Sequence, residues 1–196
     1  MNPAGRLEWD DRHQGQQPGK PEPFVLEMLP RLPRGLALDV AAGRGRHSLI
    51  LARAGMRVIA VDYSHVGIAT LAALVRPERL PVFPVVADMT QFPLREQSFD
   101  VIVNVNYLER DIVADLKRAL KVGGALLFDT FLIDEAAHHR HICNPRYLLE
   151  HGELRVLLGG LEVVEYREGL TAYGDPAAQP PMRQTWRASA LAFRRI

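Results

Sequence analysis

The sequence has few features that would suit a protein to an oxidising compartment or a membrane. Its 196 residues contain a single cysteine, Cys143, which excludes an intramolecular disulfide and favours a reducing compartment. The longest apolar runs are only as long as a strand, and the N-terminus lacks the apolar core of a signal peptide. We therefore expect a cytoplasmic protein that does not interact with a membrane.

The chain also has no excess of charge of either sign. It has 24 basic and 23 acidic side chains, a formal net charge of +1, which gives no electrostatic footprint for a nucleic acid. It has no internal repeat, and its length suits one domain. Because residues 15–23 are rich in Gly, Gln and Pro, we expect a mobile N-terminal arm over residues 1–23 and a single domain over residues 24–196. We expect a small-molecule partner and either a monomer or a homodimer.

The hydrophobic pattern alternates strands with helices along most of the chain. This alternation predicts an α/β fold of Rossmann-like type, a three-layer α/β/α sandwich around a mostly parallel seven-stranded sheet. Pro84 within the third strand indicates an edge position or a late start. The last two strands, joined by a Pro/Gly-rich loop, predict an antiparallel hairpin at the end of the sheet. The expected strands are Leu36–Ala41, Arg57–Val61, Val82–Val86, Asp100–Val105, Ala125–Phe131, Val163–Tyr166 and Thr185–Phe193. The expected helices are Phe24–Leu29, Ser48–Ala54, Val66–Val75, Asp111–Leu120 (closed by Gly123 and Gly124) and Gly152–Leu158.

A glycine turn and a carboxylate mark the tips of the first two strands. Gly43 and Gly45 allow a tight turn and a close approach of the backbone to a ligand, and the helix that follows presents free N–H groups. Asp62 ends the second strand, where it can accept hydrogen bonds from two ribose hydroxyls. This unit predicts a nucleoside-bearing cofactor across the carboxyl ends of the strands. The glycine loop would hold a pyrophosphate in a dinucleotide enzyme and the methionine part of S-adenosylmethionine in a methyltransferase.

Further polar groups follow the other strand tips. Asp39 is expected either to orient the glycine loop or to contact the cofactor's amino group through water. Asp88 can accept from an adenine amino group, and the N–H of Met89 can donate to a ring nitrogen. Asn104 is exposed beside the position of a reactive methyl group.

These motifs, in this order, resemble the class I S-adenosylmethionine-dependent methyltransferases, and among them the bacterial tellurite-resistance and thiol methyltransferase-like group. The resemblance covers nearly the whole chain. It rests on Trp9-Asp10-Asp11-Arg12-His13 at the N-terminus, on the glycine motif Leu38 to His47, on Ala60 to Ser64, on Ala87-Asp88-Met89 and on Leu120 to Leu127. Two positions depart from the family pattern: Ala41 stands where the glycine motif opens with glycine, and His13 stands where a tyrosine is usual.

The resemblance implies S-adenosylmethionine as cofactor and methyl transfer to a small molecule with a soft nucleophile, such as a thiol or a chalcogen oxyanion. It implies contacts to acceptor or cofactor after the fourth strand, where we expect Tyr107 and Arg110 as catalytic residues. The expected cofactor-binding residues are Asp39, Ala41, Gly43, Gly45, Arg46, Asp62, Tyr63, Ser64, Ala87, Asp88, Met89 and Asn104.

Two other functions stay open from the sequence: an NAD-dependent oxidoreductase and a non-catalytic cofactor-binding regulator. Two points count against the oxidoreductase. The dinucleotide-binding fingerprint has Gly or Ala at the position of Ser48, and such enzymes usually carry a second domain. His138 to His141 with Cys143 lack a standard ligand spacing, so no metal site is expected. We expect that segment, continued to Arg146, to close over the acceptor together with residues 9–12.

Overall fold

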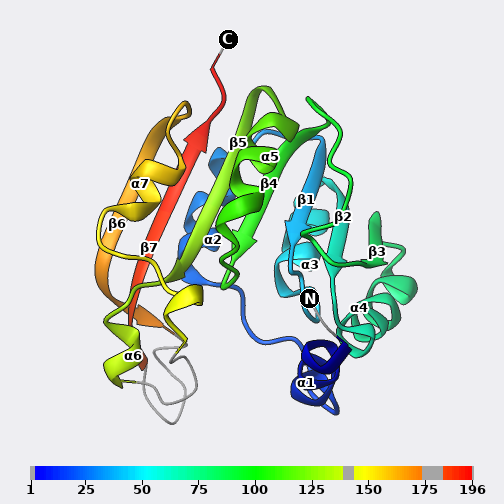
Figure 1. The fold of residues 1–196 in the computed structure, drawn as a ribbon. Coiled ribbons are helices and arrows are strands. Elements are labelled where there is room, and N and C mark those ends of the chain that lie inside the picture. The colour runs from blue at the N-terminus through cyan, green and yellow to red at the C-terminus, as the bar shows by residue number, and fades with distance from the viewer. Residues whose placement is uncertain (1–2, 139–143, 174–182, 196) are drawn as a thin grey trace.

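The computed structural model of the chain describes residues 3–138, 144–173 and 183–195. Within them a seven-stranded sheet forms the middle layer, and helices cover both of its faces (Figure 1). The strands are β1 Leu36–Val40, β2 Arg57–Asp62, β3 Val82–Val86, β4 Phe99–Val105, β5 Leu120–Phe131, β6 Glu162–Tyr173 and β7 Arg183–Phe193. The α-helices are α1 Pro3–His13, α2 Pro23–Met28, α3 Arg46–Arg53, α4 His65–Glu78, α5 Val113–Ala119, α6 Glu135–His138 and α7 Glu153–Leu157. Three 3-10 turns, η1 Leu29–Arg31, η2 Arg110–Ile112 and η3 Pro145–Tyr147, lie between them.

The sheet has the strand order β3-β2-β1-β4-β5-β7-β6. The first five strands in this order are parallel, whereas β7 runs antiparallel to both β5 and β6. This confirms the predicted mostly parallel seven-stranded sheet with a terminal antiparallel hairpin. The edge position expected from Pro84 is also confirmed, because β3 is an outer strand and tolerates a residue without an N–H.

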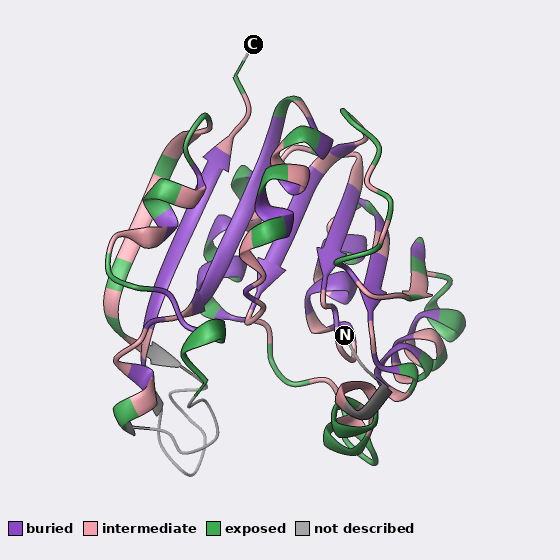
Figure 2. Cartoon of the chain, viewed as in Figure 1, coloured by how far each residue is buried: buried purple, intermediate pink, exposed green. Residues whose placement is uncertain are grey.

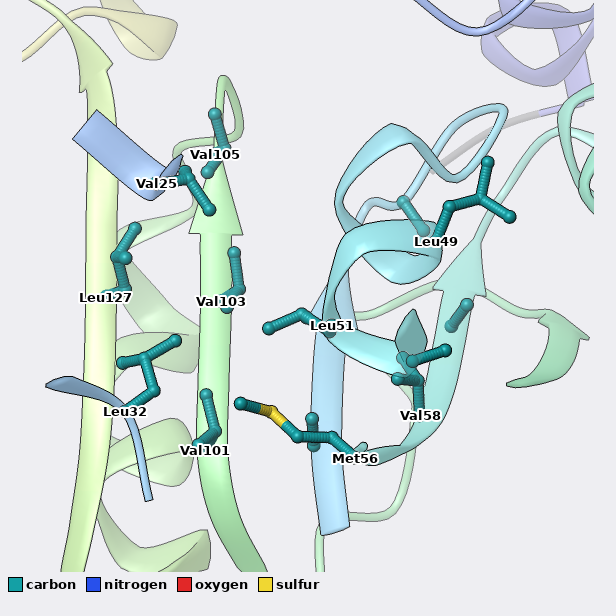
Figure 3. Packing of buried hydrophobic residues seen from close by; sticks show 14 of the residues in the cluster. Val25, Leu32, Leu49, Leu51, Met56, Val58, Val101, Val103, Val105 and Leu127 are labelled. Atoms are coloured by element: carbon teal, nitrogen blue, oxygen red, sulfur yellow. The ribbon is translucent and has the colours of Figure 1, made fainter. Parts of the chain in front are cut away.

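The core has two halves, one on each face of the sheet. Alternate residues of a strand point to opposite faces, so Val101 and Val103 of β4 pack with α2 and α3, whereas Ile102 packs with α5 and α7. Figure 3 shows the first half, in which Leu51 of α3 lies near Val103. Strands β1, β2, β4, β5 and β7 are mostly buried, whereas the outer strand β6 is not and α1 is largely exposed (Figure 2). Two buried faces explain why the central strands are continuous apolar runs.

Several element boundaries differ from the prediction, and the largest differences lie in β5 and β6. Strand β5 begins at Leu120 rather than Ala125, so the predicted helix ends one residue early and Gly123 and Gly124 lie within the strand instead of closing the helix. Pairing between Phe99 and Leu120 explains the early start, because it adds a ladder contact before the register shift in β4. Strand β6 extends to Tyr173, since it pairs with β7 along its whole length.

The largest addition to the predicted fold is helix α1. It was not expected from the sequence, which is polar around most of the helix, and it lies beside the carboxyl ends of the parallel strands (Figure 1). Residues 14–22 then run to α2 without regular structure. Within the described residues, none of the helices has the length and apolar character needed to cross a bilayer.

His151 joins the turn after β5 to strand β6 on the surface. Its Nδ1 lies 2.8 Å from Glu168 Oε1 and its Nε2 lies 2.7 Å from Asp134 Oδ2. The hydrogen bond to Glu168, followed by the charge of Asp134, raises the pKa of His151. A raised folded-state pKa means that the contact stabilises the fold below the ordinary histidine value and is lost as pH rises through the higher value.

We expect an NMR titration of His151 to give a pKa above 6.5, the ordinary value for histidine. Replacing Glu168 with Gln should move the pKa back down, because it removes the largest cause of the shift. Glu150→Gln, on an exposed neighbouring carboxylate, serves as the control and should leave the titration nearly unchanged. A His151 pKa that ignores Glu168→Gln contradicts the assignment.

Candidate functional site

A cavity of about 860 Å³ lies at the carboxyl ends of the parallel strands, next to α1. Polar and apolar groups from eight separate segments converge on it, as expected for a ligand site at this edge of an α/β sheet. The lining residues are Gly5, Glu8, Trp9, Arg12, His13, Pro18, Gly19, Ala41, Ala42, Gly43, Arg44, Arg46, His47, Asp62, Tyr63, Ala87, Asp88, Met89, Val105, Asn106, Tyr107, Leu108, Phe131, Asn144 and Tyr147.

Asp62, at the tip of β2, holds two loops of the cavity wall. Its Oδ2 accepts a hydrogen bond from the Gly43 N–H at 2.7 Å, and its Oδ1 accepts one from the Ser64 N–H at 2.7 Å. The side chain is 8% exposed, and burial raises the pKa of the carboxyl although both N–H groups oppose the shift. A carboxylate can accept about four hydrogen bonds, so Asp62 retains capacity for donors of a ligand.

Three residues of the loop after β1 adopt left-handed backbone conformations, but for different purposes. Gly43 (φ +55°) faces the cavity, since a Cβ there would lie 3.2 Å from His13 Cε1. At Gly45 (φ +81°) a Cβ would overlap the buried side chain of Leu71 in α4. Ala41 has φ +52°, a conformation that costs a residue with a side chain about 1 kcal/mol or more. This explains why a glycine is usual at the position of Ala41.

Helix α1 is attached to the start of α4 by one carboxylate. Asp10 Oδ1 accepts hydrogen bonds from Ser64 Oγ at 2.6 Å and from the Val66 N–H at 3.1 Å. The hydrogen bond from Ser64 is the main cause that lowers the pKa of Asp10. The attachment places Trp9 and Arg12 in the cavity wall.

His13 fills the space between α1 and the glycine loop. Its Nδ1 lies 2.7 Å from Nη1 of Arg44, a guanidinium that can only donate, so the imidazole accepts there. Burial lowers the pKa of His13, and this makes the ring neutral near pH 7. A neutral ring here lets Arg44 lie close to the cavity without repulsion.

A chain of buried polar groups crosses the back of the cavity. Glu22 is 1% exposed, and its Oε1 accepts from Arg46 Nη2 at 2.6 Å and from Asn106 Nδ2 at 2.9 Å. Asn106, which has φ +58°, accepts in turn from Arg187 Nη2 at 2.5 Å, and Arg187 Nε donates to Asp129 at 2.8 Å. These bonds tie the start of α3 to the tips of β4, β5 and β7.

Tyr107 and its neighbours form the uncharged end of the cavity, beyond the tips of β4 and β5. The Tyr107 hydroxyl is shut off from solvent and has no hydrogen-bond partner among the described residues. Burial, with the nearby carboxylates of Glu109 and Asp88, raises the pKa of Tyr107, so the phenol stays protonated and is not a base.

The structure brings most of the predicted site residues to the cavity wall. These are Ala41, Gly43, Arg46, Asp62, Tyr63, Ala87, Asp88, Met89 and Tyr107. Five predicted residues lie outside the wall, and each has a structural partner instead. Asp39 is 1% exposed and accepts from Ser48 Oγ at 2.5 Å, in keeping with its alternative role of orienting the loop. Gly45 packs against α4, Ser64 caps α4, and Asn104 donates to the carbonyl of Tyr107.

Arg110 is the clearest correction. Its guanidinium forms a two-pronged ion pair with Glu153 at 2.5 and 2.9 Å and donates to the carbonyls of Arg146 and Leu148. All three guanidinium nitrogens of Arg110 are therefore bonded to the segment before α7 or to Glu153 in α7. In this arrangement Arg110 fixes the segment before α7 and does not line the cavity.

Other residues of the wall were missed or only suspected from the sequence. Glu22, which braces the wall from behind, lies within the arm 1–23 that was expected to be mobile, and nothing local marks its burial. Gly67 allows α4 to approach the glycine loop, because a Cβ there would lie 2.9 Å from the Gly43 carbonyl oxygen.

Of the expected closing segment His138 to Arg146, residues 139–143 fall outside the described part of the chain, and Asn144 lines the cavity. Among the described residues no His, Cys, Asp and Glu side chains gather as metal ligands would.

The strand order, the glycine loop and the carboxylate at the tip of β2 define a Rossmann-like domain built for a nucleoside-bearing cofactor. Residues 37–124 match the family model described as a methyltransferase domain. This part of the chain is a methyltransferase domain, and the described chain shares its fold with solved S-adenosylmethionine-dependent methyltransferases.

Individual relatives agree with this family. A demethylmenaquinone methyltransferase of Thermobifida fusca is 38% identical over 104 residues, which cover 49% of this chain and 43% of that protein. The chain thus matches less than half the length of this curated relative. TehB from Haemophilus influenzae shares the fold with a TM-score of 0.73 at 23% identity, over 88% of this chain and 62% of that one. A solved structure that concerns the conversion of a disulfide bond into a thioacetal group during echinomycin biosynthesis shares the fold with a TM-score of 0.76 at 19% identity. The match covers 97% of this chain and 91% of that chain.

We expect Gly45→Ala to lower the free energy of unfolding by about 3 kcal/mol, because it combines an unfavourable φ with overpacking against Leu71. Gly55→Ala is the matched control: its φ is +91° but nothing lies within 4 Å of a Cβ, so only about 1 kcal/mol should be lost. Urea unfolding of the two variants measures the difference. Equal losses would show that Gly45 does not serve close packing.

Proposed function

We propose that this protein transfers a methyl group from S-adenosylmethionine to a small molecule with a soft nucleophilic atom, a thiol or a chalcogen oxyanion. The observation that carries the proposal is the pair of bonds by which Asp62 holds Gly43 and Ser64 at the rim of the cavity. This arrangement presents a buried carboxylate and a glycine backbone to the same ligand. We further propose that the protein acts in the cytoplasm as a monomer or homodimer, without nucleic acid or membrane partners.

The residues present fit the cofactor. The carboxylate of Asp62 would accept both ribose hydroxyls, and Asp88 with the backbone of Met89 would recognise the adenine edge. Gly43 leaves the space that a side chain would fill between the loop and His13, and Arg44 and Arg46 supply positive charge for the carboxylate of the methionine part. The cavity of about 860 Å³ lies within the range of ligand sites.

S-adenosylmethionine supplies a methyl group that is already activated on a sulfonium. The work left to the protein is to orient the acceptor and to exclude water, which is catalysis by proximity. The tips of β4 and β5 form the wall that would receive the acceptor. Tyr107 is protonated and His13 is engaged with Arg44, so neither side chain is placed to remove a proton. A soft acceptor that ionises by itself needs no such base.

The competing functions make different predictions about ligands. An NAD-dependent oxidoreductase would bind a pyrophosphate on the glycine loop. In this chain Ser48 occupies the third position of the dinucleotide fingerprint, and its hydroxyl donates a hydrogen bond to Asp39 of β1 instead. A regulator would bind S-adenosylmethionine without turnover on any acceptor. The methyltransferase assignment of the domain favours the enzyme.

We expect Asp62→Asn to weaken binding of S-adenosylmethionine about tenfold to a hundredfold in calorimetry, because two ribose hydroxyls lose their charged acceptor. Asp100→Asn is the control: Asp100 accepts from the Leu36 N–H at the opposite edge of the sheet, so this variant should bind normally. NADH should give no heat with the wild-type protein. Unchanged affinity in a folded Asp62→Asn variant contradicts the assigned cofactor site.

We also propose that α1 closes over the bound cofactor and acceptor and opens for exchange. Its support is that α1 contributes Trp9 and Arg12 to the wall yet is attached to α4 chiefly through Asp10. Closure of such an element excludes water during transfer.

Asp10→Ala should speed hydrogen exchange of residues 3–13 about tenfold, since two hydrogen bonds that hold the helix are lost. Asp11→Ala, on an exposed neighbour, should leave the exchange unchanged. S-adenosylhomocysteine should slow exchange of α1 in the wild-type protein. If the exchange of α1 responds neither to Asp10→Ala nor to this ligand, α1 is not a closing element.

A further inference from the structure

The two ends of the cavity differ in charge. The lining residues from the tips of β4 and β5 and from the segment around η3 are all uncharged: Val105, Asn106, Tyr107, Leu108, Phe131, Asn144 and Tyr147. Among the described lining residues, each charged side chain lies on α1, on the glycine loop and the start of α3, or at the tips of β2 and β3. The charged end matches the cofactor in the proposed function, so the uncharged end is left for the acceptor.

The uncharged end carries three aromatic side chains, Tyr107, Phe131 and Tyr147, and one of them is held from behind. The Phe131 ring lies under the guanidinium of Arg187, with 4.5 Å between Arg187 Cζ and the ring centroid. Arg187 is itself buried and bonded to Asp129 and Asn106, so its charge is already matched and it does not belong to the wall. Phe131 is thereby held in place as an aromatic surface of fixed orientation.

Two tyrosines complete this surface through their rings. The buried hydroxyl of Tyr107 has no described hydrogen-bond partner and stays protonated, so the side chain contributes its ring rather than a base. Tyr147, in η3, is 49% exposed and lies at the mouth of the cavity wall. The polar groups that remain at this end are the side-chain amides of Asn106 and Asn144.

Such a wall would bind an oxyanion weakly. Its charge is spread over several oxygens, each of which needs a donor or a cation when it leaves water, and aromatic rings provide neither. A planar aromatic body, in contrast, gains from burial against Phe131, Tyr107 and Tyr147.

We infer that the acceptor is a small aromatic thiol that lies against Tyr107, Phe131 and Tyr147, and not an inorganic chalcogen oxyanion. This inference rests on the proposed function and narrows its substrate class. The thiol releases its proton to water. The thiolate lone pair then forms a bond to the methyl carbon while the bond from that carbon to the sulfonium sulfur breaks and leaves its electron pair there. The products are an aryl methyl thioether and neutral S-adenosylhomocysteine, and no oxidant or reductant is required.

The test measures release of S-adenosylhomocysteine with three acceptors: thiophenol, 2-mercaptoethanol and tellurite. We expect kcat/KM for thiophenol to exceed that of the other two at least tenfold. Tyr147→Ala should raise the KM for thiophenol about fivefold and leave kcat nearly unchanged, since it removes one aromatic contact from an exposed position. Val156→Ala, a more exposed apolar residue outside the cavity, is the matched control.

Calorimetry with S-adenosylmethionine on the same preparations separates the two levels of the proposal. Absence of binding overturns the proposed function itself. Binding combined with tellurite turnover equal to or above that of thiophenol, or with no thiophenol turnover, overturns the aromatic acceptor alone. A KM for thiophenol that ignores Tyr147→Ala overturns the assigned surface.

Discussion

The carboxylate of Asp62 is the constraint on which the site depends. One side chain at the tip of β2 fixes the glycine loop through Gly43 and the start of α4 through Ser64. Ser64 then accepts the bond that caps α4 and donates the bond that holds Asp10 of α1. Three segments that are far apart in the sequence are therefore positioned by a single buried group. The raised pKa of Asp62 reflects the desolvation that this position costs.

A second buried network gives the opposite wall its shape. Asn106 adopts a left-handed conformation directly after β4, and its amide is held from both sides, by Glu22 and by Arg187. The strain of such a residue persists only where its surroundings fix it, as they do here. The Arg187–Asp129 pair at the base of the network is almost fully buried, and the loss of one partner would leave an uncompensated charge. The cavity is thus preformed by a polar network of which Asn106 lines the wall, whereas Glu22, Arg187 and Asp129 lie behind it.

The sequence predicts the sheet well because its signals are local. Continuous apolar strands, Pro84 at an edge and the motif from Leu38 to His47 each mark a feature within a few residues. The errors come from tertiary contacts. The length of β5 depends on pairing with Phe99, α1 depends on Asp10 reaching Ser64, and Gly45 and Arg110 are committed to Leu71 and Glu153. A motif shows which residue types stand near a site, but only packing decides which of them face the ligand.

The two outer strands of the sheet have a consequence for behaviour at high concentration. An exposed strand edge is a template on which another chain can add a strand, and this is a common route to aggregation. In β3 the residue Pro84 removes one N–H donor from the free edge. At the other end, β6 carries the charged residues Glu162, Glu165, Arg167 and Glu168. A second copy that paired along this edge would have to place its own strand beside these charged side chains. Both edges therefore oppose sheet extension, one by a missing hydrogen bond and the other by charged side chains that are already committed to ion pairs within the protein.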